Sequence, residues 1–107
     1  MKRGDVVVVA LYGDLGKPRP AVIMQSDIFG LTHSIGLIPI TSTLMIPSLL
    51  RLAIEPNPTN GLRVVSQVMI DKVTTTQRSK VRQIIGTFND DQMREIAVRL
   101  SAFFDLV

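Results

Sequence analysis

The chain has 107 residues, of which 46% are hydrophobic and 20% are charged, and its formal net charge at pH 7 is +3. This balance is typical of a folded protein and excludes a disordered tail, and the length favours a single domain over residues 1–107. The chain has no cysteine and one histidine, so we expect neither a metal nor a cofactor. No apolar run approaches the roughly 18 residues of a membrane span, and we expect a cytoplasmic protein with no membrane partner.

Short apolar segments bounded by turn residues predict six strands. The first segment, residues 6–12, is rich in β-branched residues, and Gly13 and Asp14 after it predict a turn. In the fourth segment, Leu50, Leu52 and Ile54 alternate with other residues, which indicates a strand with one solvent-exposed face. The predicted strands are residues 6–12, 21–25, 34–40, 50–54, 64–72 and 81–88.

The segment before residue 62 is predicted to be a loop, and the segment after it is predicted to be a strand. Residues 55–61, EPNPTNG, contain two prolines and two asparagines, which predicts a loop. If residues 64–72 form one strand, Val68 and Ile70 lie on one face, and Gln67, Met69 and Asp71 lie on the other.

A helix is predicted at the end of the chain, because the period of the apolar residues changes after Asn89. Asn89 or Asp90 is the expected N-cap, and Phe103 and Phe104 are expected in the core together with Phe88. Strands followed by one terminal helix predict a mainly β (α+β) fold, a small, strongly bent antiparallel sheet or barrel closed by an amphipathic helix. The apolar stripe consists of Met93, Ile96, Ala97, Leu100 and Phe104.

The common catalytic and nucleotide-binding motifs are absent, which leaves polar residues at predicted strand edges. They precede the second strand, follow the third and lie along the fifth. Each set also has an ordinary structural explanation, as turn residues bonding their own backbone or as a solvated ion pair. The residues are Lys17 and Arg19, then Thr41, Ser42 and Thr43, then Ser66, Gln67 and Asp71.

Five stretches in order, over nearly the whole chain, resemble the MazF/PemK family of toxins from bacterial toxin–antitoxin modules. The stretches are KRGDVVVVAL, GKPRPAVIMQSD, IPITST, NGLRVVSQVMIDKVTT and IGTFNDDQMREIAVRLSAFF. The resemblance implies an SH3-like barrel, a homodimer, and an endoribonuclease that cuts single-stranded RNA to a 2′,3′-cyclic phosphate and a 5′-hydroxyl. It also implies Arg19 and Thr41 as cleavage residues, and a small acidic antitoxin as a protein partner.

The chemistry of cleavage can be assigned to residue types independently. Arg19 presents a permanently charged fork of donors suited to a phosphorane, and Thr41 can donate a hydroxyl hydrogen bond to a phosphate oxygen. Asp71 is the candidate proton acceptor, or the group that orients Arg19, on the predicted strand face. Some relatives carry an arginine two residues before this aspartate, where this chain has Met69, so more of the phosphate binding is left to Arg19. The expected RNA-binding residues are Lys17, Ser42, Thr43, Arg63, Gln67 and Lys72.

Three questions stay open at this level. His33 precedes the third strand, where it is either a proton donor or a surface loop residue. Base stacking would rest on Tyr12 or Phe29, because the other phenylalanines are expected in the core. The alternatives to a nuclease are a CcdB-type gyrase poison of the same fold and an inert SH3-like binding module. The absence of tryptophan counts against both.

Overall fold

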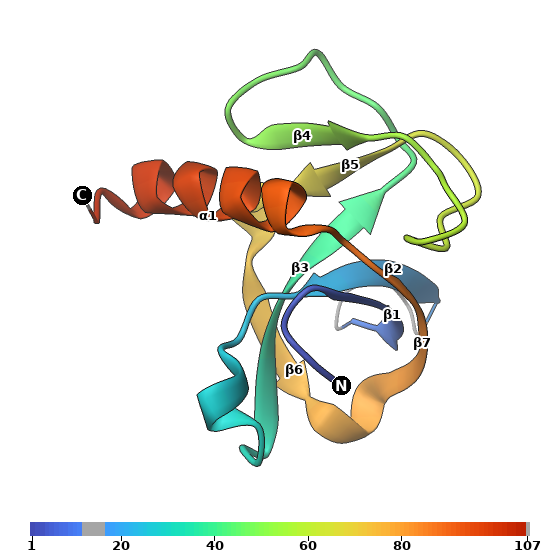
Figure 1. The fold of residues 1–107 in the computed structure, drawn as a ribbon, viewed down its shortest axis with the longest axis vertical. Coiled ribbons are helices and arrows are strands. Elements are labelled where there is room, and N and C mark those ends of the chain that lie inside the picture. Colours follow the sequence, from blue (N-terminus) through green and yellow to red (C-terminus); the bar gives the residue numbers. More distant parts are fainter. Residues whose placement is uncertain (12–16, 107) are drawn as a thin grey trace.

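The computed structural model describes residues 1–11 and 17–106, and within them seven antiparallel strands form one sheet. The sheet order is β4-β5-β3-β2-β1-β7, and β6 also pairs with β3 (Figure 1). The helix α1 follows the last strand, which confirms the predicted mainly β fold with a C-terminal helix. The strands are β1 (Asp5–Ala10), β2 (Pro18–Ile23), β3 (Ser34–Thr41), β4 (Arg51–Ile54), β5 (Ser66–Met69), β6 (Thr74–Gln77) and β7 (Val81–Thr87). The helices are η1 (Asp27–Phe29), η2 (Ile70–Lys72), η3 (Arg78–Lys80) and α1 (Asp90–Phe104).

The first two strands form an antiparallel pair that begins earlier in β2 than predicted. β2 starts at Pro18, because Pro18, Arg19 and Pro20 lie opposite Ala10, Val9 and Val8 of β1. The proline-rich segment is therefore part of the sheet, and Arg19 lies on a strand and not in a turn. The predicted strand end at Tyr12 and the turn at Gly13 and Asp14 lie outside the described residues.

The predicted strand over residues 64–72 is confirmed only for residues 66–69, which form β5, because residues 70–72 form the 3₁₀ turn η2. The Ile40–Val68 pair and the Leu37–Thr74 pair are three residues apart along β3 but six residues apart along the opposite segment. The 3₁₀ turn of η2 accommodates the extra residues. The pairing with β3 then resumes in β6, a polar TTTQ strand that apolar alternation does not reveal.

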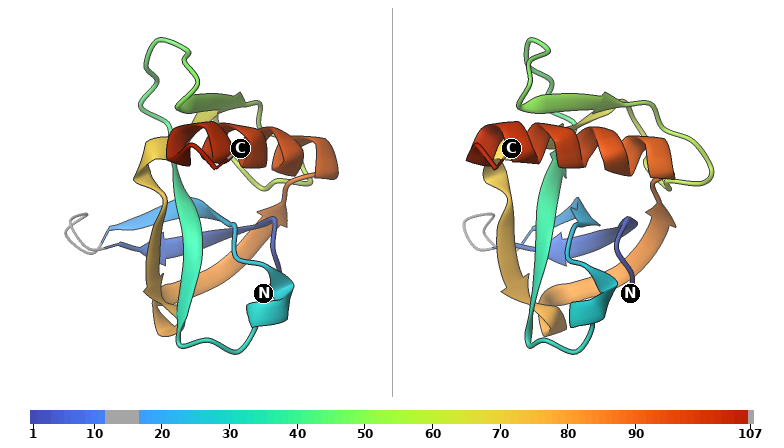
Figure 2. Two further views of the ribbon diagram at one scale, coloured as in Figure 1. Left: turned by 90° about the vertical axis from the view of Figure 1, so that its left-hand side faces the viewer. Right: turned by 60° about the vertical axis from the view of Figure 1, so that its left-hand side comes forward.

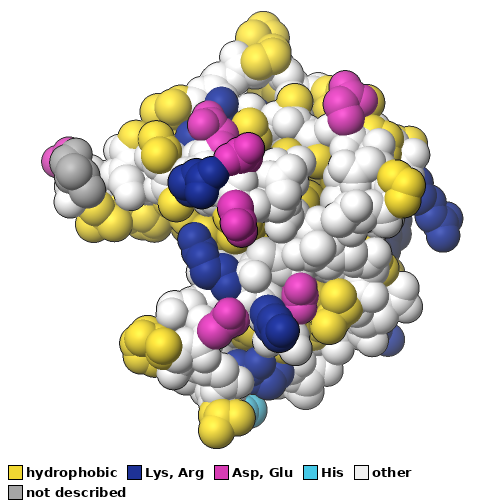
Figure 3. Space-filling view, viewed as in Figure 1, with side chains coloured by type: hydrophobic (Ala, Val, Ile, Leu, Met, Phe, Trp, Pro, Cys, Tyr) yellow, Lys and Arg dark blue, Asp and Glu magenta, His cyan; other side chains and the backbone are white. Residues whose placement is uncertain are grey.

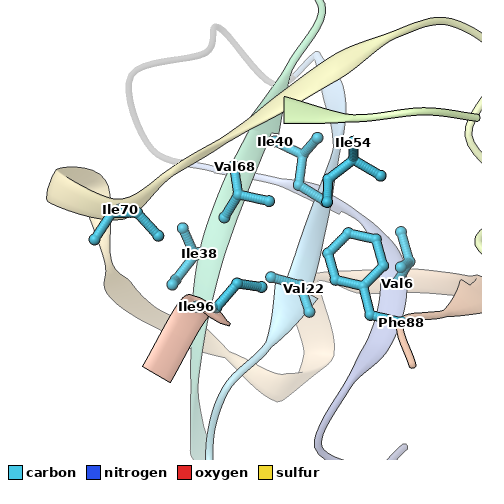
Figure 4. Close-up of a cluster of buried hydrophobic side chains, with 9 residues drawn as sticks. All are labelled: Val6, Val22, Ile38, Ile40, Ile54, Val68, Ile70, Phe88 and Ile96. Atoms are coloured by element: carbon cyan, nitrogen blue, oxygen red, sulfur yellow. The ribbon is translucent and has the colours of Figure 1, made fainter. Parts of the chain in front are cut away.

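Two hydrophobic clusters lie on opposite faces of the sheet, and β1 contributes to both. Val6 and Val7 are both fully buried, which explains the uninterrupted valine run of this strand. The helix-side cluster consists of Val6, Val22, Ile38, Ile40, Ile54, Val68, Ile70, Phe88 and Ile96 (Figure 4). The second cluster consists of Val7, Val9, Ala21, Ile23, Ile35 and Leu37.

The helix α1 begins with a capping box and ends beyond the sheet. Asn89, the predicted N-cap, accepts the Gln92 N–H at 2.8 Å, and the Gln92 side chain accepts the Asn89 N–H at 3.0 Å. Ile96 is fully buried, but Phe103 and Phe104, expected in the core, are 42% and 52% exposed. The reason is that the C-terminal end of α1 projects past the strands (Figure 1). In two further views α1 lies between β4 and the β1–β2 pair (Figure 2).

The predicted loop at residues 55–61 is organised around one buried amide. Asn60 is 1% exposed, and its Oδ1 accepts the N–H groups of Asn57 at 3.1 Å and Leu62 at 3.0 Å. Its Nδ2 donates to the carbonyl of Glu55 at 2.9 Å. The loop then docks on β7, where Thr87 N–H donates to the Thr59 carbonyl at 2.9 Å. The Asn60 side chain thus closes the loop before the chain enters β5.

We predict that Asn60→Ala lowers the free energy of unfolding by about 2–3 kcal/mol, because it leaves buried backbone groups without hydrogen-bond partners. Urea unfolding followed by circular dichroism measures this change. Thr59→Ala is the matched control in the same loop, because Thr59 is exposed and joins β7 through its backbone carbonyl. Equal stability of the two variants would contradict the role assigned to Asn60.

Candidate functional site

A cleft of about 700 Å³ opens where β2 begins and β3 ends, a size within the range of small-molecule sites in proteins. Its walls come from β1, β2, β3, β5 and β7, and from residues that precede β2, follow β3 or lie between β4 and β5. The lining residues are Val8, Lys17, Pro18, Arg19, Pro20, Ile40, Thr41, Ser42, Thr43, Gly61, Leu62, Arg63, Val64, Ser66, Gln83 and Ile85. The cleft therefore brings together five of the residues expected around Arg19, from three separate parts of the sequence.

Arg19 is held on β2 between two prolines. Each proline ring fixes its own φ near −65°, so the backbone on both sides of Arg19 has little conformational freedom. Arg19 is half-buried and lies opposite Val9 in the β1–β2 pair. The main chain thereby restricts the range of positions from which the guanidinium can approach a ligand.

Thr41 ends β3 and forms the turn that follows. It is 6% exposed, and its Oγ1 accepts the Thr43 N–H at 3.0 Å. This hydrogen bond is the local turn predicted as the ordinary explanation for the PITST segment. The turn does not remove these residues from the site, because Thr41, Ser42 and Thr43 all line the cleft.

The charged residues that line the described part of the cleft are all cations. They are Lys17, Arg19 and Arg63, and the lining residues within 1–11 and 17–106 include no Asp, Glu or His. Such a wall attracts anions and favours a ligand with phosphate groups. Over residues 1–11 and 17–106, no cluster of three His, Cys, Asp or Glu side chains is arranged to hold a metal ion.

Gln67, predicted to bind RNA, instead holds the segment after β3. It is 3% exposed, its Nε2 donates to the Met45 carbonyl at 2.9 Å, and its Oε1 accepts the Met45 N–H at 3.1 Å. Both ends of the amide are therefore engaged with one backbone residue. Gln67 is not among the residues that line the cleft.

Asp71 and Lys72 lie in η2 and are exposed, and neither lines the cleft. The strand face on which Asp71 was expected does not exist, because β5 ends at Met69. His33 is exposed, and its carbonyl accepts the Arg78 N–H at 2.9 Å. Phe29 is 56% exposed on η1 and does not line the cleft. Tyr12 lies outside the described residues.

Two further polar residues line the cleft: Ser66, a candidate from the sequence to which no role was assigned, and Gln83, which the sequence did not single out. Ser66 begins β5, is 2% exposed, and its hydroxyl donates to the Val64 carbonyl at 2.9 Å. Gln83 lies on β7 and is exposed into the cleft. The one signal in the sequence is that Arg82 and Gln83 are consecutive polar residues in a strand that is otherwise mostly apolar.

No helix within the described residues has both the length and the apolar character needed to cross a membrane.

The fold is similar to that of several solved toxins. The toxin MazF-mt6 of Mycobacterium tuberculosis superposes with a TM-score of 0.81 at 22% identity, over 94% of this chain and 96% of that one. An endoribonuclease in complex with its cognate antitoxin, from a mycobacterial species, superposes at 0.82 with 18% identity, over 100% and 97% of the two chains. MazF in a MazE–MazF crystal structure from Deinococcus radiodurans superposes at 0.79 with 17% identity, over 100% and 98%.

Sequence comparison identifies the family. A relative from Mycolicibacterium smegmatis, described as a probable endoribonuclease MazF, is 44% identical over 94 residues, which are 87% of this chain and 86% of the relative. The family model for the PemK-like, MazF-like toxin of type II toxin–antitoxin systems matches residues 2–104. The resemblance found in the five sequence stretches is confirmed, and the chain belongs to the PemK-like, MazF-like toxin family.

Proposed function

We propose that this protein is an endoribonuclease toxin that cleaves single-stranded RNA at a short sequence and thereby stops translation and growth. The observation that carries the proposal is the cationic cleft, in which Arg19 and Thr41 share a wall in a chain of this family. The relative from Mycolicibacterium smegmatis is described as a probable endoribonuclease, which supports the same activity here. It also favours a nuclease over a gyrase poison or an inert binding module.

The proposed reaction uses the 2′-hydroxyl of the RNA as its nucleophile. A bond forms between the 2′-oxygen and phosphorus, the bond from phosphorus to the 5′-oxygen breaks, and the products are a 2′,3′-cyclic phosphate and a 5′-hydroxyl. Arg19 binds the oxygens on which negative charge grows, and Thr41 donates its hydroxyl to one of them. Lys17, Arg63, Ser42 and Thr43 bind neighbouring phosphates.

The reaction also removes a proton from the 2′-hydroxyl and supplies one to the 5′-oxygen. We assign neither transfer to a described residue that lines the cleft. Arg19 stays protonated at neutral pH and is a poor base. The described residues lining the cleft of one chain include no carboxylate and no imidazole. Asp71 is exposed on η2 outside this wall, so its position no longer supports a role as proton acceptor.

We propose that a cognate antitoxin covers this cleft. A solved relative is an endoribonuclease in complex with its cognate antitoxin, and another is a MazE–MazF assembly. A cleft whose described charged residues are all cationic fits an acidic protein segment, which would compete with RNA for the same groups. We propose that the toxin works in the cytoplasm, where messenger RNA is translated.

We propose that the protein acts as a homodimer. The segment after β3 exposes Leu44, Met45, Ile46 and Leu49, with Ile46 88% exposed. Arg99 of α1 donates to the carbonyl of Ser48 at 2.8 Å, which holds this segment beside the helix. In the space-filling view, hydrophobic side chains stand out over this segment at the top and along the C-terminal end of α1 (Figure 3). An apolar surface of this kind suits a second copy of the chain.

We predict that Arg19→Ala lowers the cleavage rate of a single-stranded RNA pool at least about 100-fold, because the charge on the phosphorane loses its fixed donors. Circular dichroism is expected to remain unchanged. Arg94→Ala is the matched control, because the Arg94 side chain is 71% exposed on α1 and does not line the cleft. Retention of full activity by the Arg19 variant would remove Arg19 from the site, and an intact RNA pool with folded wild-type protein would refute the nuclease.

We predict that Thr41→Val slows cleavage about tenfold, which is the equivalent of one hydrogen bond, while RNA binding is retained. Single-turnover rates and fluorescence anisotropy measure the two effects separately. Thr41→Ser keeps the hydroxyl and is expected to cut at nearly the wild-type rate. If Thr41→Val cuts as fast as wild type, Thr41 is a turn residue and has no part in the reaction.

We predict that Ile46→Lys converts the dimer to a monomer, because it places a charge at the centre of the proposed contact. Sedimentation velocity gives the mass in solution. Leu31→Lys is the control, since Leu31 is 101% exposed on the connection between η1 and β3 and lies outside the proposed contact. A monomeric wild type, or loss of the dimer in the Leu31 variant instead, would contradict the assignment of this surface.

A further inference from the structure

A row of three residues crosses the floor of the cleft from β7 to β2. Gln83 of β7 lies directly opposite Val8 of β1, and Val8 lies directly opposite Pro20 of β2. Residues that are direct partners in neighbouring strands place their side chains on the same face of the sheet, and all three line the cleft. The row runs from the residue next to Arg19 to an amide on the opposite side.

This row is long enough to hold one base of an RNA chain. Adjacent strands are separated by about 4.8 Å, so the backbones of Pro20 and Gln83 are about 10 Å apart. Arg19 lines the same cleft next to Pro20, so a phosphate bound at Arg19 would leave a neighbouring base within reach of Val8 and Gln83. This geometry divides the cleft into a cationic part and a part that is apolar except for Gln83 and Ser66.

The chemistry of the second part suits a base and not a phosphate. Val8, Pro20 and Ile85 present apolar atoms that can contact the face of a base. The Gln83 amide has one donor group and one acceptor, and no side-chain hydrogen bond within the described residues engages it. Phosphate contacts carry no sequence information, whereas amides bind the edges of bases, and adenine in particular.

The wall beside Gln83 is held close to β7 by two glycines. A Cβ atom on Gly61, whose φ is +71°, would lie 2.1 Å from the Ile85 carbonyl oxygen. A Cβ atom on Gly86 would lie 2.3 Å from the Asn60 carbonyl carbon. Only glycine allows this backbone approach. The backbone of Asn60 and Gly61 is therefore held against β7 before a ligand binds, which lowers the ordering cost of recognition.

We propose that Gln83 is a specificity-determining residue that binds one adenine of the RNA substrate, donating to a ring nitrogen and accepting from the 6-amino group. This inference rests on the proposed nuclease function, and it identifies which side chain reads a base in the site. Arg19 and its neighbours bind the phosphate, and Gln83 selects the nucleotide.

The test is the sequence preference of Gln83→Glu against wild type, obtained by sequencing the fragments of a randomised single-stranded RNA pool. A carboxylate accepts but does not donate, so it favours guanine, whose N1–H and 2-amino group are both donors. We expect wild type to prefer adenine at one position, and we expect the adenine-to-guanine ratio there to fall at least about tenfold in the variant. The preferences at the other positions remain as in wild type.

Gln77→Glu is the matched control, because this substitution makes the same change in charge as Gln83→Glu. Gln77 is an exposed glutamine on β6 that does not line the cleft. The inference is overturned if wild type shows no adenine preference, if Gln83→Glu leaves the ratio unchanged, or if Gln77→Glu changes it equally.

Binding of 2′-deoxy oligonucleotides, which lack the nucleophile, separates this inference from the nuclease function. Fluorescence anisotropy compares adenine with guanine at one position. If no RNA is cut but Gln83→Glu still reverses the binding preference, the proposed nuclease fails and the base contact stands. If RNA is cut and the preference is the same in both proteins, the base contact fails alone.

Discussion

The burial of β1 on both of its faces is the constraint on which the rest of the structure depends. Val6 and Val7 are consecutive, so their side chains lie on opposite faces of the strand, and both are fully buried. Such a strand is stable between two apolar layers, which here are the helix-side cluster and the second cluster. β2 and β7 pair with its two edges, and this arrangement places Pro20, the residue next to Arg19, and Gln83 on either side of Val8.

The cleft is a continuation of the helix-side cluster beyond the part that α1 covers. Ile40 belongs to that cluster and also lines the cleft, and Ile85 packs against the same cluster. The floor of the site is therefore part of the core, which gives the cationic residues at its edge a rigid support. Side chains placed on strands are held more tightly than side chains on free loops, and this favours electrostatic stabilisation that needs no rearrangement.

Local patterns predicted most elements, and a shift in strand pairing accounts for the main error. The alternation of apolar and polar residues, the turn residues and the spacing from Met93 to Leu100 are properties of residues near one another in the chain. They could therefore be recognised in the sequence. The insertion at η2 is a property of the pairing with β3, and it moved Asp71 off the predicted strand face. The strand character of β6 also comes from β3, because four exposed or half-buried polar residues carry no apolar alternation.

The sequence by itself determined the family, the strand and helix periods, and the candidates Arg19 and Thr41, because these depend on residue types and on spacing along the chain. Only the tertiary structure decided which polar groups share a wall. Gln67 and Thr41 are direct partners in the β3–β5 pair, yet one amide is buried against Met45 while the threonine lines the cleft. Gln83 reaches the same cleft from a strand distant in the sequence. These outcomes depend on strand order, register and the glycine-dependent docking of residues 55–61, which arise from contacts between segments and have no local pattern.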